Sequence, residues 1–382
     1  MFKKISVLLV FITAFSTAQN LNSNSTGSFT YIPSGPLSDQ PVEVYYHIPS
    51  GDITSMPIVF SFHGAGRNAD DYRDFWIDMA NDNGFIVIAP EFSSNNYPGL
   101  GDNYLMGNVF DDGDNPTPGS RNPENEWTFS VIEPLFDTIL DDISSTQTSY
   151  KAWGHSGGSQ FLHRFLFFKP DSRLEVAVCS NAGWYTVPEV GVSFPYGIDN
   201  SELPESNIIH AFATKLIVHL GESDTNQNSS GLRHNTVVDN QQGLNRFVRG
   251  NYFFNTSQAE AEDIDVAFNW ELDTVPNVGH NAQQMANDAL PHILSSGLGV
   301  ENDDFINFQI GPNPIKNEIR FDNSQANFSK IEVFNLSGQT LKIINNIKSN
   351  QKSIVFNELS HGIYILRFSN QIDSKIFRII KN

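Results

Sequence analysis

The sequence predicts an α/β fold with a mainly parallel sheet and helices on both faces, followed by a small C-terminal all-β sandwich domain. Between residues 56 and 294, buried strand patterns alternate with helical patterns, which is typical of parallel sheets with helical crossovers. After about residue 300 the helix patterns stop and short β-type runs follow one another. The charge changes at the same place: residues 305–382 hold 10 Lys and Arg and 5 Asp and Glu, so they carry +5 while the rest of the chain carries −25.

The first eighteen residues are typical of a secretory signal peptide. Lys3 and Lys4 precede an apolar stretch over residues 5–15, and small residues follow at 16–18. The apolar stretch is shorter than the roughly 20 residues that a spanning helix needs, so we expect no stable membrane span. The sequence therefore predicts four parts: a signal peptide at 1–18, an α/β domain at 19–300, a linker at 301–304 and a β-domain at 305–382.

The elements of the α/β domain are expected in a regular order. An antiparallel strand pair lies within residues 27–50. The expected buried strands are 56–64, 85–90, 150–156, 174–183, 214–221 and 268–276. The expected helices are 69–84, which ends at Gly84, 126–143, in which Pro134 implies a kink or a later start, 157–168, 231–254 and 281–294. The stretches 93–125 and 185–207 are rich in Gly, Pro, Asn and Asp, and we expect these long loops to form walls of a site.

Composition and motif content exclude several classes of function. A net charge of −20 opposes binding to nucleic acid or to an anionic membrane. Cys179 is the only cysteine, so an intramolecular disulfide is impossible, and its apolar neighbours predict a buried, inert thiol. Residues 111–126 are acidic but lack the spacing of a calcium loop. Because no Cys/His cluster suits zinc and no phosphate-binding loop follows a strand, we expect no metal and no cofactor.

A candidate nucleophile lies between the strand predicted at 150–156 and the helix predicted at 157–168. Gly154-His155-Ser156-Gly157-Gly158 has the form Gly-X-Ser-X-Gly. In a strand-turn-helix context this pattern lifts the serine hydroxyl clear of the sheet, and the glycines permit close packing. A structural turn that caps the helix is the alternative. We predict that Ser156 is a nucleophile.

A serine nucleophile in this context requires an acid and then a histidine later in the chain, at the ends of later strands. Glu222 and Asp224 directly follow one buried strand, and His280 follows the last one. Asp224 is preferred as the orienting acid because it lies deeper in its loop, and Glu222 is the alternative. For the other histidines near the predicted strands and helices a structural role is expected: His155, His163, His219 and His292.

An oxyanion hole needs two backbone N–H groups. Gly157, which follows the nucleophile, supplies one. The glycine-rich loop after the first parallel strand, His63-Gly64-Ala65-Gly66, supplies the other, and we predict Ala65 as the donor with Gly66 as the alternative. His63 is expected to position this loop rather than to carry a proton.

The glycine loop, the Gly-X-Ser-X-Gly turn, Asp224 and His280 together resemble the α/β-hydrolase superfamily. Over roughly residues 27–296 the chain is most similar to extracellular esterases of the polyhydroxyalkanoate depolymerase and feruloyl esterase type, although it lacks their frequent cysteine pairs. The resemblance implies that Trp184 and Tyr185 line the substrate cleft. An ordinary place in the core is the alternative for both aromatic residues.

Residues 305–382 resemble a second family, the type A sorting domain of the type IX secretion system. The resemblance is carried by Pro-Asn-Pro at 312–314, Asn-Leu-Ser-Gly at 335–338, Gly-Ile-Tyr at 362–364 and a basic C-terminus. It implies export through the periplasm and the outer membrane, with the type IX secretion machinery as partner and a secreted or cell-surface location. A carbohydrate-binding sandwich is the alternative, but all five Trp lie earlier in the chain.

These observations predict a secreted serine esterase that cleaves polymer-borne or diffusible carboxylic esters. Ser156 attacks the ester carbonyl, His280 transfers the proton and Asp224 orients His280. The expected partner is an ester substrate, either polymeric or diffusible, such as an acylated or feruloylated polysaccharide or a polyester. Two alternatives remain: a peptidase of the same fold, and a surface binding protein that retains the fold without catalysis.

Overall fold

The computed structural model describes residues 21–295, 310–311, 315–321, 323, 328–335, 340–357, 359–370 and 374–381. The chain divides into two compact units, Met1–Gly299 and Val300–Asn382. The predicted signal peptide at 1–18 and the predicted linker at 301–304 lie outside the described residues.

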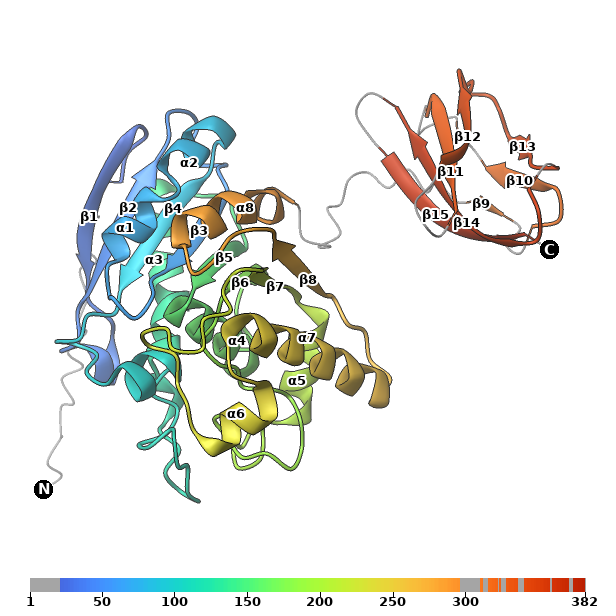
Figure 1. Ribbon diagram of the computed structural model, residues 1–382. Coiled ribbons are helices and arrows are strands. Elements are labelled where there is room, and N and C mark those ends of the chain that lie inside the picture. The colour runs from blue at the N-terminus through green and yellow to red at the C-terminus, as the bar shows by residue number, and fades with distance from the viewer. Residues whose placement is uncertain are drawn as a thin grey trace, which may run out of the picture. The chain divides into compact units, whose positions relative to one another are not determined.

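One eight-stranded sheet forms the centre of the first unit (Figure 1), in the order β1-β2-β4-β3-β5-β6-β7-β8. The strands are β1 Ser25–Tyr31, β2 Val42–Ile48, β3 Ile58–Phe62, β4 Ile86–Glu91, β5 Tyr150–His155, β6 Leu174–Ser180, β7 Lys215–Gly221 and β8 Trp270–Val275. The β1–β2 and β2–β4 pairs are antiparallel, and every other pair is parallel. The predicted mainly parallel sheet is therefore confirmed. Its strands are apolar on both sides because helices cover both faces.

Alternate strand residues separate the two faces of the sheet. On β3, Val59 packs with Trp76 and Met285, whereas Phe60 packs on the opposite face, 6.4 Å from the Phe136 ring. The Val59 face carries α1 Ala69–Asp74, α2 Ile77–Asn83 and α8 Ala282–Leu294. The Phe60 face carries α3 Ile132–Ile143, α4 Gly157–Phe168, α5 Glu205–Ala213, α6 Thr236–Gln242 and α7 Arg246–Asp263.

Two of the predicted helices are each divided in the structure. The helix expected over 231–254 is α6 and α7, because Gly243 adopts a φ of 97° and the Asn245 side chain caps the second helix by accepting from the Val248 N–H. The helix expected over 69–84 is α1 and α2, and it ends as predicted at Gly84, which has a φ of 71°.

The remaining helical segments lie in or near the long loops. α3 begins at Ile132, so Pro134 lies in its first turn, where proline is tolerated. The 93–125 loop contains a π-helical turn, Leu100–Leu105. α5 was not predicted: it begins at Glu205, inside the stretch expected as a loop over 185–207, and it buries Ile208 and Phe212. Short 3-10 helices occur at Gly35–Leu37, Glu124–Glu126 and Thr128–Val131.

The second unit is a small β-domain of two sheets, as predicted. The three-stranded sheet has the order β13-β10-β9 and the four-stranded sheet the order β12-β11-β14-β15. Their strands are β9 Ile310–Gly311, β10 Glu318–Phe321, β11 Lys330–Phe334, β12 Thr340–Asn345, β13 Ser353–Val355, β14 Gly362–Ser369 and β15 Ser374–Lys381. Ile319 and Phe321 from one sheet share a core with Val333, Leu366 and Phe368 from the other.

Candidate active site

Ser156 occupies a sharp turn between β5 and α4. Its backbone has φ 57° and ψ −111°, a conformation that non-glycine residues rarely adopt. The turn needs both flanking glycines: a Cβ at Gly154 would lie 2.4 Å from the Gly158 carbonyl oxygen, and one at Gly158 would lie 1.9 Å from the Phe62 carbonyl oxygen. The Ser156 N–H donates to the Ser180 carbonyl at 2.9 Å, which ties the turn to β6. The glycines thus fix a strained backbone that presents the hydroxyl.

His280 lies between Ser156 and Asp224. Its Nδ1–H donates to Asp224 Oδ2 at 2.6 Å, and its Nε2 is 3.0 Å from Ser156 Oγ. Because the carboxylate accepts a hydrogen bond from Nδ1–H, Nε2 is left as the acceptor for the serine hydroxyl. The three side chains come from loops after three different strands, and the fold brings them into one connected array, which we call the Ser156 array.

Asp224 is only 4% exposed, and one cation stands beside it. Arg246 Nη1 is 3.6 Å from Asp224 Oδ1, and its guanidinium also donates to Ser229 Oγ at 2.6 Å. The buried carboxylate therefore has His280 on one oxygen and Arg246 on the other. Glu222, the alternative acid, is exposed and accepts a hydrogen bond from the Thr274 hydroxyl at 3.0 Å. The geometry thus favours Asp224.

The loops that carry Asp224 and His280 are joined to each other. The Ser223 N–H donates to the Val278 carbonyl at 2.8 Å. Asn181, at the end of β6, accepts from the Gly221 N–H at 2.8 Å and donates to the Gly279 carbonyl at 3.2 Å. These contacts fix the positions of the loops that carry Asp224 and His280 relative to each other. Neither Asn181 nor Arg246 was singled out in the sequence analysis, because neither belongs to a motif.

The glycine loop lies next to the nucleophile. The position that a Cβ on Gly157 would take is 3.1 Å from the Ala65 backbone nitrogen, and the corresponding position on Gly64 is 3.7 Å from Ser156 Cβ. Among the residues that the structure describes, neither the Ala65 N–H nor the Gly157 N–H has an acceptor. Gly157 is the first residue of α4, where N–H groups have no partner within the helix. The two predicted donors are therefore close to each other and to the backbone of the turn that carries Ser156.

His63 fixes the position of this loop through two hydrogen bonds. Its Nδ1–H donates to the Gly64 carbonyl at 2.9 Å, and its Nε2 accepts from the Phe92 N–H at 3.1 Å. Burial lowers the pKa of His63 to about 3, so the ring is neutral and its two nitrogens keep these opposite roles. The Tyr104 hydroxyl, from the 93–125 loop, donates to the His63 carbonyl at 2.7 Å. His63 positions the loop, as expected.

Comparison with solved structures identifies the first unit. Poly(aspartic acid) hydrolase-1 from Sphingomonas sp. KT-1 is 33% identical, with a TM-score of 0.66, and the match covers 72% of this chain and 100% of that chain. This chain belongs to the α/β-hydrolase superfamily. Poly(3-hydroxybutyrate) depolymerase from Bordetella parapertussis is 27% identical, with a TM-score of 0.65, over 70% of this α/β-hydrolase and 88% of the depolymerase. No match was found among curated proteins.

The end of the α/β-hydrolase chain matches a second family. Residues 309–382 match the family described as a secretion system C-terminal sorting domain, which confirms the resemblance to the type IX sorting domain. Such a domain directs export to the cell surface or the medium, so this chain is a secreted hydrolase. Within the described residues, no helix is both long enough and apolar enough to cross a membrane.

The other histidines of the α/β-hydrolase unit lie outside the Ser156 array. His155 is fully buried, packs 4.5 Å from the His280 ring and accepts from the Tyr72 hydroxyl at 3.2 Å. Burial holds the pKa of His155 well below its usual value, and the cation of Arg246 nearby adds to this effect. A neutral ring thus supports His280 from the side. The three other histidines for which a structural role was expected pair elsewhere: His163 with Ser159, His219 with Asp288 and His292 with Asp273.

Trp184 and Tyr185, the aromatic residues implied for the substrate cleft, lie inside the α/β-hydrolase unit. Trp184 is 1% exposed and lies between two guanidinium groups, Arg164 at 4.0 Å and Arg233 at 4.6 Å from its ring centroid. Tyr185 is fully buried and stacks on Phe253 at 4.5 Å. Neither side chain offers surface to a substrate here, so their role in substrate binding rests on the resemblance alone.

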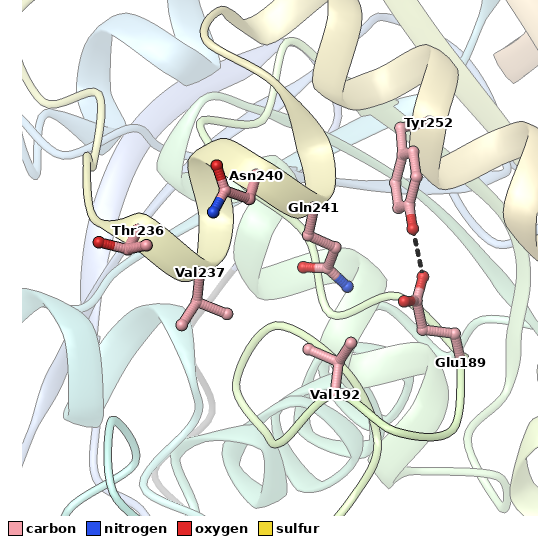
Figure 2. Close-up of a pocket in the computed structure, with 7 residues that line it drawn as sticks. All are labelled: Glu189, Val192, Thr236, Val237, Asn240, Gln241 and Tyr252. Carbon is pink, nitrogen blue, oxygen red and sulfur yellow. Dashed lines mark hydrogen bonds between the residues drawn. The ribbon is translucent and has the colours of Figure 1, made fainter.

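Two hollows flank α6. The first has a volume of about 520 Å³ and is lined by Glu189, Val192, Thr236, Val237, Asn240, Gln241 and Tyr252. In this hollow the Tyr252 hydroxyl donates a hydrogen bond of 2.6 Å to Glu189 (Figure 2). The second has a volume of about 660 Å³ and shares Thr236 and Val237 with the first. Residues of the 185–207 loop line the first, and Asp114 of the 93–125 loop lines the second. None of the Ser156 array residues lines either hollow.

Proposed function

We propose that the protein is a secreted serine esterase, and that the Ser156 array is its catalytic triad. The observation that carries this proposal is the pair of contacts on His280, 3.0 Å from Ser156 Oγ and 2.6 Å from Asp224 Oδ2. A base within hydrogen-bond reach of the hydroxyl, oriented by a buried carboxylate, is what a serine needs to act as a nucleophile.

The reaction follows from these positions. Ser156 Oγ attacks the ester carbonyl carbon while its proton passes to His280 Nε2, and Asp224 stabilises the imidazolium that forms. The N–H groups of Gly157 and Ala65 bind the oxyanion. His280 then gives the proton to the departing alcohol, which leaves an acyl group on Ser156. Water, deprotonated by His280, attacks this acyl-enzyme, and the carboxylic acid and Ser156 are released.

A carboxylic ester, polymer-borne or diffusible, is the proposed substrate. Support comes from the two related structures, whose names are those of a poly(aspartic acid) hydrolase and a poly(3-hydroxybutyrate) depolymerase. The sorting domain adds support because it implies export, and extracellular substrates include polymers. Because the first of these names refers to an amide polymer, a peptidase-like activity is the second candidate. The long loops supply the substrate walls in either case.

The test uses the full chain and a matched Ser156→Ala variant. Hydrolysis is measured on p-nitrophenyl esters from acetate to octanoate, on a ferulate ester, and on poly(3-hydroxybutyrate) and poly(aspartic acid). Ester hydrolysis that disappears in the variant is the expected result. Labelling of Ser156 by a fluorophosphonate with hydrolysis of poly(aspartic acid) alone would favour the second candidate. An unlabelled Ser156 with no hydrolysis would instead indicate a binding protein.

A further inference from the structure

A second group of polar side chains lies on the face of the sheet covered by α8. His219 comes from β7, Asp273 from β8, and Asp288 and His292 from α8. Asp288 and His292 are four residues apart, so they share one face of the helix. β7, β8 and α8 are neighbouring elements in Figure 1. None of these side chains takes part in the proposed reaction.

The side chains approach one another as metal ligands do. One ligand atom each from His219, Asp273 and Asp288 lies within 4.8 Å of the other two. His219 Nε2 is 3.1 Å from Asp288 Oδ1, and His292 Nε2 is 2.7 Å from Asp273 Oδ2. Zn²⁺ binds imidazole nitrogen and carboxylate oxygen at about 2.0–2.2 Å, so tetrahedral ligand atoms stand roughly 3.4 Å apart. The ligand atoms of His219, Asp273 and Asp288 lie within 4.8 Å of one another, and His292 joins the group through Asp273, so metal binding requires these side chains to turn toward one centre.

The two carboxylates of this group lack the usual protein cation. In the described part of the chain, neither Asp273 nor Asp288 forms an ion pair with a lysine or arginine, and each is paired only with a histidine. Asp239 makes an instructive contrast, since it accepts from His234 and also pairs with Arg249 at 2.8 Å. Two neighbouring carboxylates without such a partner favour a cation.

His219 also has the support that a metal-binding imidazole needs. The His219 side chain is fully buried, and its Nδ1 is 2.8 Å from Ser180 Oγ, which accepts from Trp153 Nε1–H at 2.9 Å. When Nδ1–H donates to this hydroxyl, Nε2 is left unprotonated and faces Asp288. A second hydrogen bond of this kind fixes the tautomer and orientation of most histidine ligands.

We propose that His219, Asp273, Asp288 and His292 form a site for a divalent transition-metal ion of the Zn²⁺ class. The mixture of imidazole and carboxylate ligands suits Zn²⁺ better than Ca²⁺ or Mg²⁺, which prefer oxygen ligands alone. The ion joins β7, β8 and α8. Since the loops that carry Asp224 and His280 directly follow β7 and β8, the site clamps the segment that holds acid and base. This revises the expectation, drawn from sequence spacing, that the chain binds no metal.

In the first experiment the untagged, full-length, EDTA-treated protein is titrated with ZnCl2. Calorimetry measures binding, and thermal unfolding measures the melting temperature. Saturable binding of one Zn²⁺ per chain is expected, with a melting temperature that rises on Zn²⁺ and not on Mg²⁺. Binding should release protons, because the ligands bind the metal in their deprotonated forms. Absence of saturable binding in the wild-type protein overturns the proposal without any variant.

The variants locate the site. Asp273→Asn and Asp288→Asn keep the side-chain shapes and are each expected to weaken Zn²⁺ binding at least ~10-fold, a change in the range seen when a metal site loses supporting groups. His219→Gln should weaken it further. His234→Gln is the matched control, because it breaks a surface His–Asp pair whose carboxylate already has an arginine partner. Unchanged affinity in the three site variants, or equal loss in His234→Gln, overturns the assignment.

Discussion

The described residues include two Ser–His–Asp arrays, and these differ in their surroundings. In the Ser156 array, His280 lies 3.0 Å from Ser156 Oγ and 2.6 Å from Asp224. In the second, which we call the Ser180 array, His219 lies 2.8 Å from Ser180 Oγ and 3.1 Å from Asp288. The heavy-atom contacts are nearly the same, so hydrogen bonds alone do not distinguish a nucleophile from a structural serine.

The difference lies in the backbone and in access. Ser180 is the last residue of β6, is fully buried, and its hydroxyl already accepts from Trp153. Ser156 sits in a turn with a φ of 57°, is partly exposed, and has the N–H groups of Gly157 and Ala65 beside it. In the proposed reaction, this exposure gives a carbonyl carbon access to Ser156, and the two N–H groups are the proposed oxyanion donors. The strained turn, rather than the histidine contact, marks the candidate nucleophile.

Replacement of the two serines is expected to give the largest difference between the two arrays. Ser156→Ala should lower kcat for ester hydrolysis by about 10⁵-fold, because the nucleophile is removed and only binding and oxyanion stabilisation remain. Ser180→Ala should leave kcat within a few-fold of wild type and lower stability by about 1–3 kcal/mol, because it leaves buried partners of the hydroxyl unsatisfied. Steady-state kinetics and chemical denaturation measure the two effects. Comparable losses of kcat in both variants would show that the arrays are not distinct.

Replacement of the acids gives the next largest effect. Asp224→Asn keeps the shape of the side chain but favours the wrong tautomer of His280, so kcat should fall by about 10⁴-fold. Asp288→Asn makes the same change in the Ser180 array and should leave kcat nearly unchanged. Both are assayed on one ester in the presence of EDTA, so that bound metal does not contribute. A small effect of Asp224→Asn would point to Glu222 as the orienting acid.

The Ser156 array could be predicted from sequence, and the Ser180 array could not. Gly-X-Ser-X-Gly is a local pattern, and its fold context demands an acid and then a histidine in chain order, which Asp224 and His280 satisfy. The Ser180 array depends on the packing of α8 against β7, and no local sequence motif predicts this contact. The same is true of Arg246, whose contact with Asp224 joins the start of α7 to the loop after β7.

The fold, like the site, could be predicted in part from the sequence. The alternation of strands and helices identifies the parallel sheet, because buried strands are uniformly apolar. The division of the 231–254 segment was missed, since it depends on the positive φ of Gly243 and on the Asn245 cap rather than on hydrophobic spacing. α5 was missed because its two large buried residues, Ile208 and Phe212, are too few to give a clear helical period.

Arg246 offers a test within the Ser156 array itself. Arg246→Gln removes the cation 3.6 Å from Asp224 Oδ1, so kcat should fall by about 10-fold with little change in KM, since the arginine acts through the acid and not on the substrate. Stability should fall by about 3–5 kcal/mol, because a buried carboxylate loses its partner.

The control for this prediction is a second buried arginine on the same helix. Arg249 pairs with Asp239 and donates to the Gly183 carbonyl at 2.7 Å, away from the array. Arg249→Gln should destabilise the protein to a similar extent and leave kcat unchanged, and Arg246→Lys should restore part of the lost kcat. Equal kcat values for the two Gln variants would mean that Arg246 acts only on the fold.

The smallest effect concerns His63, a histidine that belongs to neither array. Its pKa is about 3 in the folded protein, against about 6.5 in an unfolded chain, so below pH 6.5 the unfolded state binds a proton that the folded state does not. His63 therefore contributes stability above pH 6.5 that is lost as the pH falls, by about 1.4 kcal/mol per pH unit. Urea unfolding at pH 7, 6 and 5 should show a slope that is shallower by this amount in His63→Gln than in wild type. Equal slopes in the wild type and in His63→Gln would mean that His63 is protonated in the folded protein. The assignment of a neutral ring that donates to Gly64 and accepts from Phe92 would then be wrong.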